Sequence, residues 1–491
     1  MLKSSSSPCN SLQSRIFGTE KSTQRLPWLN LVITVYVGAV LLIYMLFMIA
    51  PFITFLCKTP FYHISSYLGI LGGFLLILDL FTNKGLWRGP CCILLYGICV
   101  MSCISALRTM QYGIHDNLFD ICWVVIQFAL IYSWVYRLNS RQITQFFRIL
   151  YPICLSVWFI ACCVSLYQFV YQIGYRYTAD TLSLNPELTR QGFLQHRLFG
   201  VFTGLDYAVY ISLMLIIIGV YFFGQTKKLW KKILLAAMMF VLLMHIILSG
   251  SRSVQISLFL YVFFYAWIQV RNRISSRGFR RIAVQCAASL CAVVICAGCF
   301  FGLKYVAQYV PSLFNAQISM EDDVLERDGL DGDVSNNRFA IWKDYISLYK
   351  DIGLVGLSLS NYNDYIKDNH SDLYIVHYFQ EDFGNAEKSD MVYESHNNYL
   401  FVFVSVGLLG LLLFAAFLGI FIIRLLRYIS QQKALSATFI AALAIVCVGC
   451  VEALFMNSVF LKINAPSFFF WFAFGYLMWT ISPKDSQSVA A

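Results

Sequence analysis

The chain has 491 residues, of which 59% are hydrophobic and only 13% are charged. Because soluble domains carry about 25% charged residues, this composition excludes a disordered chain and argues against a soluble enzyme. The net charge is +10, but the basic residues gather in a few connectors, so the charge does not indicate nucleic-acid binding. The chain is predicted to lie in a lipid bilayer, whose hydrocarbon core is spanned by about 20 apolar residues in a helix.

Apolar runs bounded by charged or turn residues predict transmembrane helices, because a helix satisfies its own backbone hydrogen bonds in lipid. The predicted fold class is an all-α polytopic membrane protein with about 12 transmembrane helices and one large extracytoplasmic loop that contains an amphipathic helix. The predicted spans are 28–56, 64–81, 89–107, 118–136, 149–173, 200–223, 233–248, 253–270, 282–303, 398–423, 435–458 and 463–481.

Basic residues occur in every second connector, which indicates the topology. If all the spans are real, these connectors fall on one side, and the positive-inside rule makes that side cytoplasmic. Both termini are then cytoplasmic, in what the sequence predicts to be a bacterial plasma membrane. The connectors contain Lys84 and Arg88, Arg137, Arg141 and Arg148, Lys227, Lys228, Lys231 and Lys232, Arg271, Arg273, Arg277, Arg280 and Arg281, and Arg424, Arg427 and Lys433.

The predicted organisation follows from these spans. The sixteen cysteines are spread mainly through apolar runs, where they act as small apolar side chains and indicate no disulfide framework. The predicted units are a disordered cytoplasmic tail over 1–27, transmembrane helices one to nine over 28–303, an extracytoplasmic catalytic loop over 304–397, transmembrane helices ten to twelve over 398–481, and a cytoplasmic tail over 482–491.

The 304–397 loop is the only sizeable polar region, with seventeen carboxylates against seven Lys and Arg. Its acidic stretch 321–333 loosely resembles a calcium loop but lacks the closing Glu of an EF-hand, so a solvated acidic loop is the preferred interpretation and no metal site is predicted. An amphipathic helix is predicted after it, either along the outer membrane interface or packed on the loop's own core. The predicted apolar face of this helix is Phe339, Trp342, Ile346, Tyr349 and Ile352.

Three residues on the predicted outer side are suited to chemistry. Arg252 follows a very short turn between two spans, where an arginine loses hydration and needs a partner unless it extends to the headgroup level. Arg338 begins the predicted outer helix and its planar fork can bind phosphate, the alternative being a surface pairing with the acidic loop. His396 precedes span ten and can take a proton near neutral pH, although a simple boundary role is the alternative.

The end of the outer loop carries a spaced motif. His396-Asn397 is followed after nine residues by Gly407 and two residues later by Gly410. This motif resembles the His-(Asn/Ser/Gln)-x9-Gly-x-x-(Gly/Thr/Val) pattern of the O-antigen ligase and polysaccharide polymerase superfamily. That superfamily includes lipid-linked glycan polymerases, O-antigen ligases and related teichoic acid enzymes.

Two further segments extend the resemblance over about residues 190–415. Arg338 is followed by Trp342 where the family pattern Arg-x3-Leu has leucine, which keeps the apolar character. Arg197-x-x-Gly200-x-Phe202 matches the family's Arg-x-x-Gly-x-Phe segment, but the family's next Pro-Asn is replaced by a segment that contains Asp206. Asp206 and Glu452 lie in apolar runs, and the preferred interpretation is that they pair with Arg197, Arg252 or Lys462.

The resemblance implies a metal-independent, inverting glycosyltransferase without a cofactor. Its partners would be a glycan donor linked to polyprenyl (undecaprenyl) diphosphate, a glycan or lipid acceptor, and the lipid bilayer. Arg252 and Arg338 would bind the diphosphate, and His396 would be the catalytic base. Arg197, Asn397, Asp206 and Trp342 would give support; Asn397 would orient the imidazole or the acceptor.

The predicted activity is that of a cell-surface or capsule polysaccharide polymerase, because lipopolysaccharide ligases serve only cells with an outer membrane. An O-antigen or teichoic-acid-type ligase with the same donor is the alternative, since both kinds of enzyme share the histidine motif. A flippase for lipid-linked oligosaccharides is a lesser alternative. A flippase needs charge deep within its spans, whereas Asp79 and Asp120 lie near span ends and the long outer loop favours surface chemistry.

Overall fold

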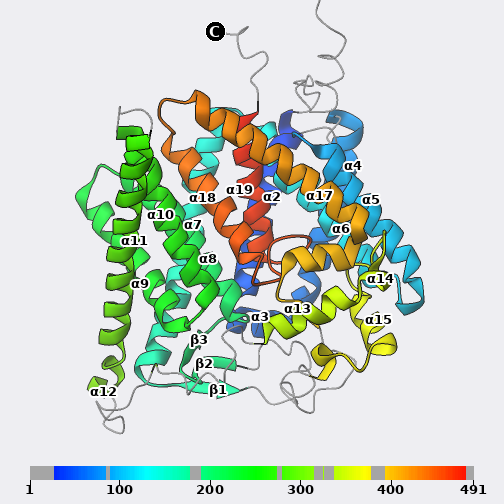
Figure 1. Cartoon of the computed structure of the whole chain (residues 1–491), viewed down its shortest axis with the longest axis horizontal. Helices are drawn as coiled ribbons and strands as arrows, with labels where there is room; N and C mark the ends of the chain where they lie inside the picture. Colours follow the sequence, from blue (N-terminus) through cyan, green and yellow to red (C-terminus); the bar gives the residue numbers. More distant parts are fainter. Residues whose placement is uncertain are drawn as a thin grey trace, which may run out of the picture.

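The computed structural model describes residues 27–83, 89–176, 190–273, 279–314, 325, 337–377 and 393–482. Within these residues the chain forms a bundle of helices that run side by side (Figure 1). Eight helical stretches are long and apolar enough to cross a membrane, which confirms the predicted all-α polytopic membrane protein. These stretches are α2 (Pro27–Phe47), α4 (Ile64–Asn83), α7 (Ser140–Val170), α8 (Leu205–Gln225), α9 (Leu229–Ser249), α10 (Arg252–Arg273), α11 (Phe279–Ala307) with α12 (Val310–Phe314), and α17 (Asn398–Gln431).

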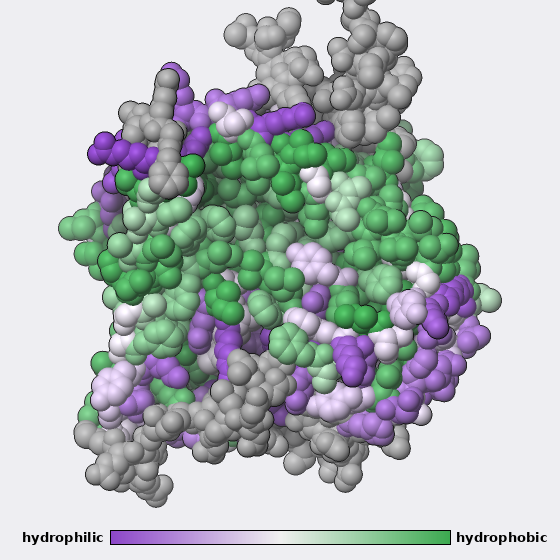
Figure 2. Space-filling model, viewed as in Figure 1, coloured by the Kyte–Doolittle hydropathy of each residue, from purple (hydrophilic) through white to green (hydrophobic). Residues whose placement is uncertain are grey.

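Shorter helices occupy the remaining predicted spans. Three of them are the apolar helices α5 (Cys92–Arg108), α18 (Ala437–Glu452) and α19 (Ala465–Ile481). The fourth predicted span is α6 (His115–Ile126) continued by a π-helical run, Gln127–Tyr132. On the face shown in Figure 2, apolar residues cover the middle of the bundle and hydrophilic residues gather toward its two ends, as expected for a protein embedded in a lipid bilayer.

A three-stranded antiparallel sheet, which was not predicted, lies at one end of the bundle (Figure 1). Its strands are β1 (Gly174–Arg176), β2 (Arg190–Leu194) and β3 (Arg197–Gly200). The predicted start of span six at residue 200 is therefore wrong, because α8 begins only at Leu205. The turn between β2 and β3 is Gln195-His196 with positive φ at both residues. Such hairpins usually contain Asn-Gly, so their usual sequence signal is missing here.

The first predicted span, 28–56, is not one helix. It breaks between α2 and α3 (Ala50–Cys57), where Ile49 forms a β-bridge to Phe202. The amide of Ala50 donates to the carbonyl oxygen of Val201 at 2.8 Å, and the amide of Thr203 donates to that of Met48 at 2.9 Å. These bonds attach the segment between β3 and α8 to the break between α2 and α3, and so fix the position where α8 begins.

A second break lies inside α17 at Gly407, whose φ of 68° and ψ of −173° are not helical. The segment 353–358, from the predicted outer loop, lies against this break. The amide of Leu408 donates to Gly353 O at 3.1 Å, and the amide of Leu357 donates to Val404 O at 2.7 Å. A Cβ on Gly407 would lie 2.4 Å from Leu354 O. The glycine therefore allows two backbones to approach closely, and the segment 353–358 is attached directly to α17.

We expect Gly407→Ala to lower the thermal unfolding midpoint, because this backbone region is open almost only to glycine and other residues cost about 1–3 kcal/mol in it. The clash with Leu354 O adds to that cost. Gly419→Ala in the same helix is the matched control, since a Cβ there meets nothing within 4 Å and alanine favours the helix by about 0.5–1 kcal/mol. Equal midpoints for the two variants would contradict this account of the break.

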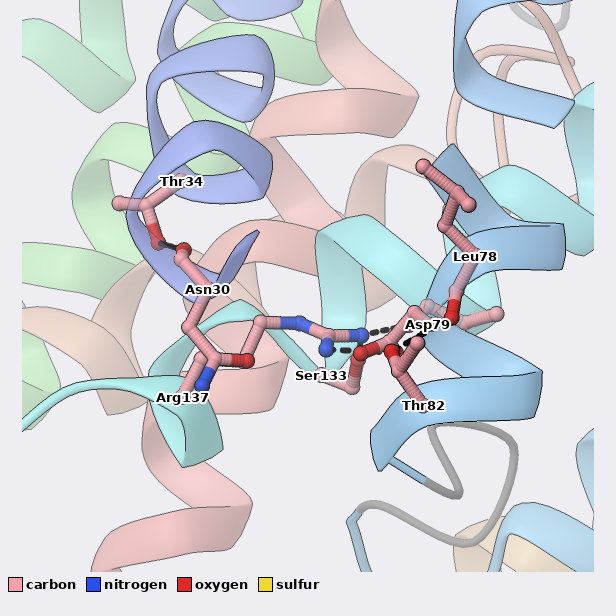
Figure 3. A network of polar contacts seen from close by, with 8 residues as sticks. Asn30, Thr34, Leu78, Asp79, Thr82, Ser133 and Arg137 are labelled. Carbon is pink, nitrogen blue, oxygen red and sulfur yellow. Dashed lines mark hydrogen bonds and ion pairs between the residues drawn. The ribbon is translucent and has the colours of Figure 1, made fainter. Parts of the chain in front are cut away.

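A buried ion pair lies among α2, α4 and the 3-10 helix Trp134–Arg137, which follows the π-helical run after α6 (Figure 3). Arg137 Nη1 donates to Asp79 Oδ2 at 2.7 Å, and both side chains are fully buried. Arg137 Nη2 also donates to Ala129 O at 2.8 Å and to Ser133 Oγ at 3.1 Å. The expectation that Arg137 is a cytoplasmic connector residue is therefore wrong. Because its charge is balanced by Asp79 inside the bundle, Arg137 does not indicate which end of the bundle is cytoplasmic.

Removing one member of this pair should destabilise the protein more than removing both. Asp79→Leu leaves a buried guanidinium uncompensated, which typically costs about 3–5 kcal/mol, whereas apolar replacement of both partners is often close to neutral. We expect Asp79→Leu to lower the unfolding midpoint in detergent and Asp79→Leu/Arg137→Met to restore most of it. The exposed Arg141→Met is the charge control. A double variant as unstable as the single one would contradict a role as a balanced pair.

Candidate active site

Arg197 and Asp206 meet at the end of the bundle that carries the sheet. Arg197 begins β3 and Asp206 lies in the first turn of α8. The Arg197 Nη2 atom is 3.4 Å from Asp206 Oδ1, and Nε donates to Ser249 O at 2.9 Å. The predicted pairing of Asp206 with an arginine is therefore confirmed for Arg197. Through Ser249 this arginine also fixes the short α9–α10 turn, which passes through Gly250 at a φ of 64°.

Arg252 and Arg338 lie next to this pair. Arg252 is the first residue of α10, directly after Ser251, which hydrogen-bonds to Asp206. Arg338 is the first residue of α13 (Arg338–Ser347), and its guanidinium carbon lies 5.8 Å from the centre of the Phe455 ring. Burial lowers the pKa of Arg338, whereas Asp206 and Glu452 raise it and the neighbouring Arg197 and Arg252 lower it. Three arginines from distant segments therefore share one electrostatic environment.

His396 lies at the same place, in the short segment before α17. Its Nδ1 atom is 3.9 Å from Glu394 Oε2, and the Tyr207 hydroxyl donates to Glu394 Oε1 at 3.2 Å. Burial lowers the pKa of His396 and Glu394 opposes this effect; Arg338 also lowers the pKa and Asp206 raises it. The imidazole is 29% exposed and its backbone has a φ of 45°, an uncommon value for histidine. A lowered pKa favours the neutral ring, the form that accepts a proton.

Asn397 and Trp342 have packing and capping contacts. The Asn397 side chain caps α17 by accepting hydrogen bonds from the amides of Tyr399 and Leu400 at 3.0 and 3.1 Å. This cap fixes the start of α17 and so positions His396 through the backbone; the prediction was that Asn397 orients the imidazole or the acceptor. Trp342 is partly buried and packs edge-on against Phe339.

Glu452, at the end of α18, is fully buried beside the arginines. The Ser257 hydroxyl donates to Glu452 Oε1 at 2.6 Å, and Glu452 lies within electrostatic reach of Arg338 and Asp206. Lys462, the other predicted partner for a carboxylate, lies 3.9 Å from the centre of the Phe401 ring and is an electrostatic neighbour of Asp120. The site thus combines three arginines with three carboxylates, Asp206, Glu394 and Glu452, and one histidine.

Arg108, at the end of α5, was not predicted as a site residue. Its guanidinium donates to the carbonyl oxygens of Asp351 at 2.6 Å, and of Ile352 and Gly356 at 3.0 Å. These three oxygens belong to α14 (Tyr349–Ile352) and the segment against the α17 break. Arg108 therefore holds the helix pair that begins at Arg338. In the sequence it looks like any cation at a span end, so no local signal distinguishes it.

The predicted apolar face of α13 is divided by the fold. Phe339, Ile346 and Tyr349 are exposed, whereas Trp342 is partly buried and Ile352 is buried. Besides Ile352, the residues that pack inward are Ile341, Tyr345 and Leu348, which the predicted face did not include. The prediction that the helix packs on the loop's own core through this face is therefore wrong. The Tyr345 hydroxyl also donates to Tyr393 O, three residues before His396, so α13 is tied to the histidine segment.

The acidic stretch 321–333, considered above as a calcium loop, lies outside the described residues except for Leu325. In the part of the chain that the structure does describe, no group of three or more His, Cys, Asp or Glu is arranged to hold a metal ion. The positive charge at the site comes from its arginines.

Comparison with known protein families gives one match. A family model described as O-antigen ligase matches residues 237–415. The matched segment contains Arg252, Arg338, His396 and the two motif glycines, whereas Arg197 and Asp206 lie before it. No curated protein and no solved structure matches the chain. The chain is therefore a multi-pass membrane protein whose residues 237–415 form a domain of the O-antigen ligase and polysaccharide polymerase superfamily.

Proposed function

We propose that this protein transfers a glycan from a polyprenyl (undecaprenyl) diphosphate donor to the hydroxyl of an acceptor sugar, and that it is a cell-surface polysaccharide polymerase. One observation carries the proposal. Arg252, Arg338 and His396 come from three segments far apart in the sequence. Arg338 and His396 lie beside Asp206, and Arg252 is an electrostatic neighbour of Arg338 and directly follows Ser251, which hydrogen-bonds to Asp206. Two phosphate-binding cations and a proton acceptor are what this reaction needs.

The two arginines suit a diphosphate leaving group. As the bond from the anomeric carbon to the phosphate oxygen breaks, negative charge gathers on the diphosphate. Arg252 and Arg338 are each the first residue of a helix, and helix N-termini add amide donors and a favourable dipole for an anion. Donors already fixed in a partly dehydrated site stabilise developing charge strongly, typically by about 10²–10³-fold in rate for each donor.

His396 suits the acceptor side of the reaction. A neutral imidazole takes the proton from the acceptor hydroxyl, whose oxygen forms the new bond to the anomeric carbon. Direct attack opposite the leaving diphosphate inverts that carbon. Glu394, 3.9 Å from Nδ1, stabilises the imidazolium that results, and Arg197 holds Asp206 and the α9–α10 turn in place.

An O-antigen or teichoic-acid-type ligase is the second candidate, and the description of the matched family favours it. Both activities use the same donor and differ in acceptor. For either activity we propose that the site faces the outside of a bacterial plasma membrane and that both termini are cytoplasmic. The basic residues Arg148, Lys231 and Arg271 lie toward the helix ends remote from Asp206, which supports this orientation.

We expect the purified protein in lipid nanodiscs to convert a polyprenyl-diphosphate oligosaccharide into a ladder of longer lipid-linked glycans. Electrophoresis of labelled products measures this, and a single transfer to an added lipid acceptor with no ladder would instead identify a ligase. EDTA should leave the rate unchanged, because arginines supply the positive charge. Loss of turnover with EDTA that magnesium restores would contradict the metal-independent part.

A further inference from the structure

A cavity lies near the end of the bundle remote from the candidate active site. Its volume is about 520 Å³, within the range of about 300–1,000 Å³ that is usual for small-molecule sites. It lies between α7, α8, α18 and α19, with Lys231 of α9 at its edge. Tyr221 in its wall lies fifteen residues beyond Asp206 along α8, which corresponds to roughly 22 Å at 1.5 Å per residue.

The deep part of this cavity is apolar. Met214, Ile445 and Phe469 line it, and Met214 and Phe469 are almost fully buried in the protein. Met214 lies eleven residues before the end of α8, so the lining reaches roughly 16 Å inward from that end. A depth and a wall of this kind suit a hydrocarbon chain.

The mouth of the cavity, where it opens to the surface, is lined by cationic side chains. Arg148 and Lys231 both line it, and both side chains are exposed. The Tyr221 hydroxyl has Arg148 and Tyr476 as electrostatic neighbours, and Thr438 adds a hydroxyl at the same end. None of the described residues that line the cavity is a carboxylate. The charge at this mouth is therefore complementary to an anion.

We propose that this cavity binds one anionic glycerophospholipid from the membrane leaflet at this end of the bundle. Its phosphate would lie between Arg148 and Lys231, and one acyl chain would extend toward Met214 and Phe469. Basic pockets between membrane helices are known to bind acidic lipid headgroups. The polyprenyl donor fits less well, because its diphosphate must reach Arg252 and Arg338 at the opposite end. The inference does not depend on the proposed glycosyl transfer.

Native mass spectrometry of the detergent-purified protein, titrated with phosphatidylglycerol or with phosphatidylcholine, tests the site. We expect phosphatidylglycerol to bind preferentially and Arg148→Ala/Lys231→Ala to weaken it about fivefold per cation, or about 25-fold together. Phosphatidylcholine binding should change little. The matched control is Arg141→Ala/Lys227→Ala, which removes the same charge from exposed residues that do not line the cavity, and it should bind phosphatidylglycerol like the wild type.

A second variant tests the chain-binding part while keeping both cations. Ala441 lines the cavity, so Ala441→Phe should fill it and reduce phosphatidylglycerol binding at least tenfold. Unchanged binding in this variant would overturn the proposal, as would equal losses in the two double variants or equal binding of the two lipids. Displacement of phosphatidylglycerol by an equimolar polyprenyl phosphate would overturn the choice of lipid and assign the cavity to the carrier.

Discussion

Arg338→Ala is expected to lower the turnover of the lipid-linked donor by at least about two orders of magnitude while the protein still folds. The guanidinium is half-buried over Phe455 and shares its surroundings with Asp206 and Glu452. A donor diphosphate would meet it at the start of α13. The measurement is the initial rate with purified protein, together with donor affinity, so that binding and chemistry are separated.

Two comparisons sharpen this test. Arg338→Lys should rescue poorly, because an ammonium cannot donate two parallel hydrogen bonds to a phosphate. Lys343→Ala, in the same helix but exposed, removes the same charge and should retain activity. The expectations for Arg252→Ala and Arg252→Lys are the same as for Arg338. A wild-type rate in both alanine variants would remove the phosphate-binding role, and full rescue by lysine would remove only the bidentate geometry.

His396→Ala should lose about 10²–10⁴-fold in turnover, the usual contribution of a general base, with donor affinity nearly unchanged. His396→Gln should be as inactive, since an amide can donate a hydrogen bond but cannot take the proton. His115→Ala is the control, because the His115 side chain is 95% exposed. A glutamine variant that keeps most activity would show that His396 only packs or donates a hydrogen bond.

The pH dependence of the rate gives an independent readout of the same histidine. Only the neutral imidazole accepts a proton, so the rate should fall as the pH drops through the pKa of His396. Burial lowers this pKa, so the fall should come below the ordinary value of about 6.5. Glu394 raises the pKa, so Glu394→Gln should move the fall to still lower pH. If the rate of His396→Gln still falls as the pH drops, the fall is due to the titration of another group.

The fold class could be predicted because its signals are local, whereas the roles of the site residues stay predictions. Lipid requires long apolar runs, and the runs of α7, α9 and α11 are visible in the sequence without any tertiary information. The order of Arg252, Arg338 and His396 led to proposed roles only through the family resemblance. The structure adds that Arg338 and His396 lie beside Asp206.

The features that sequence patterns did not reveal depend on contacts between distant segments. The break at Ile49 exists because that residue pairs with Phe202, yet the apolar run continues through it. Gly407 was recognised as a motif residue, but the reason for glycine appears only when Leu354 lies against it. Arg137 was taken for a connector charge because its partner, Asp79, is 58 residues away.

Residues 353–358 are attached to the α17 break. The stretch before them, residues 338–352, therefore acts as a spacer of fixed length. Arg338 stands at one end of that stretch, and Gly353, bonded to Leu408, stands at the other. Adding one residue inside α13 would turn Arg338 by about 100° around the helix axis and move it by about 1.5 Å. The number of residues between Arg338 and Gly353 therefore sets the direction in which the guanidinium points, and changes of length there should be tolerated far less well than substitutions at exposed positions such as Lys343.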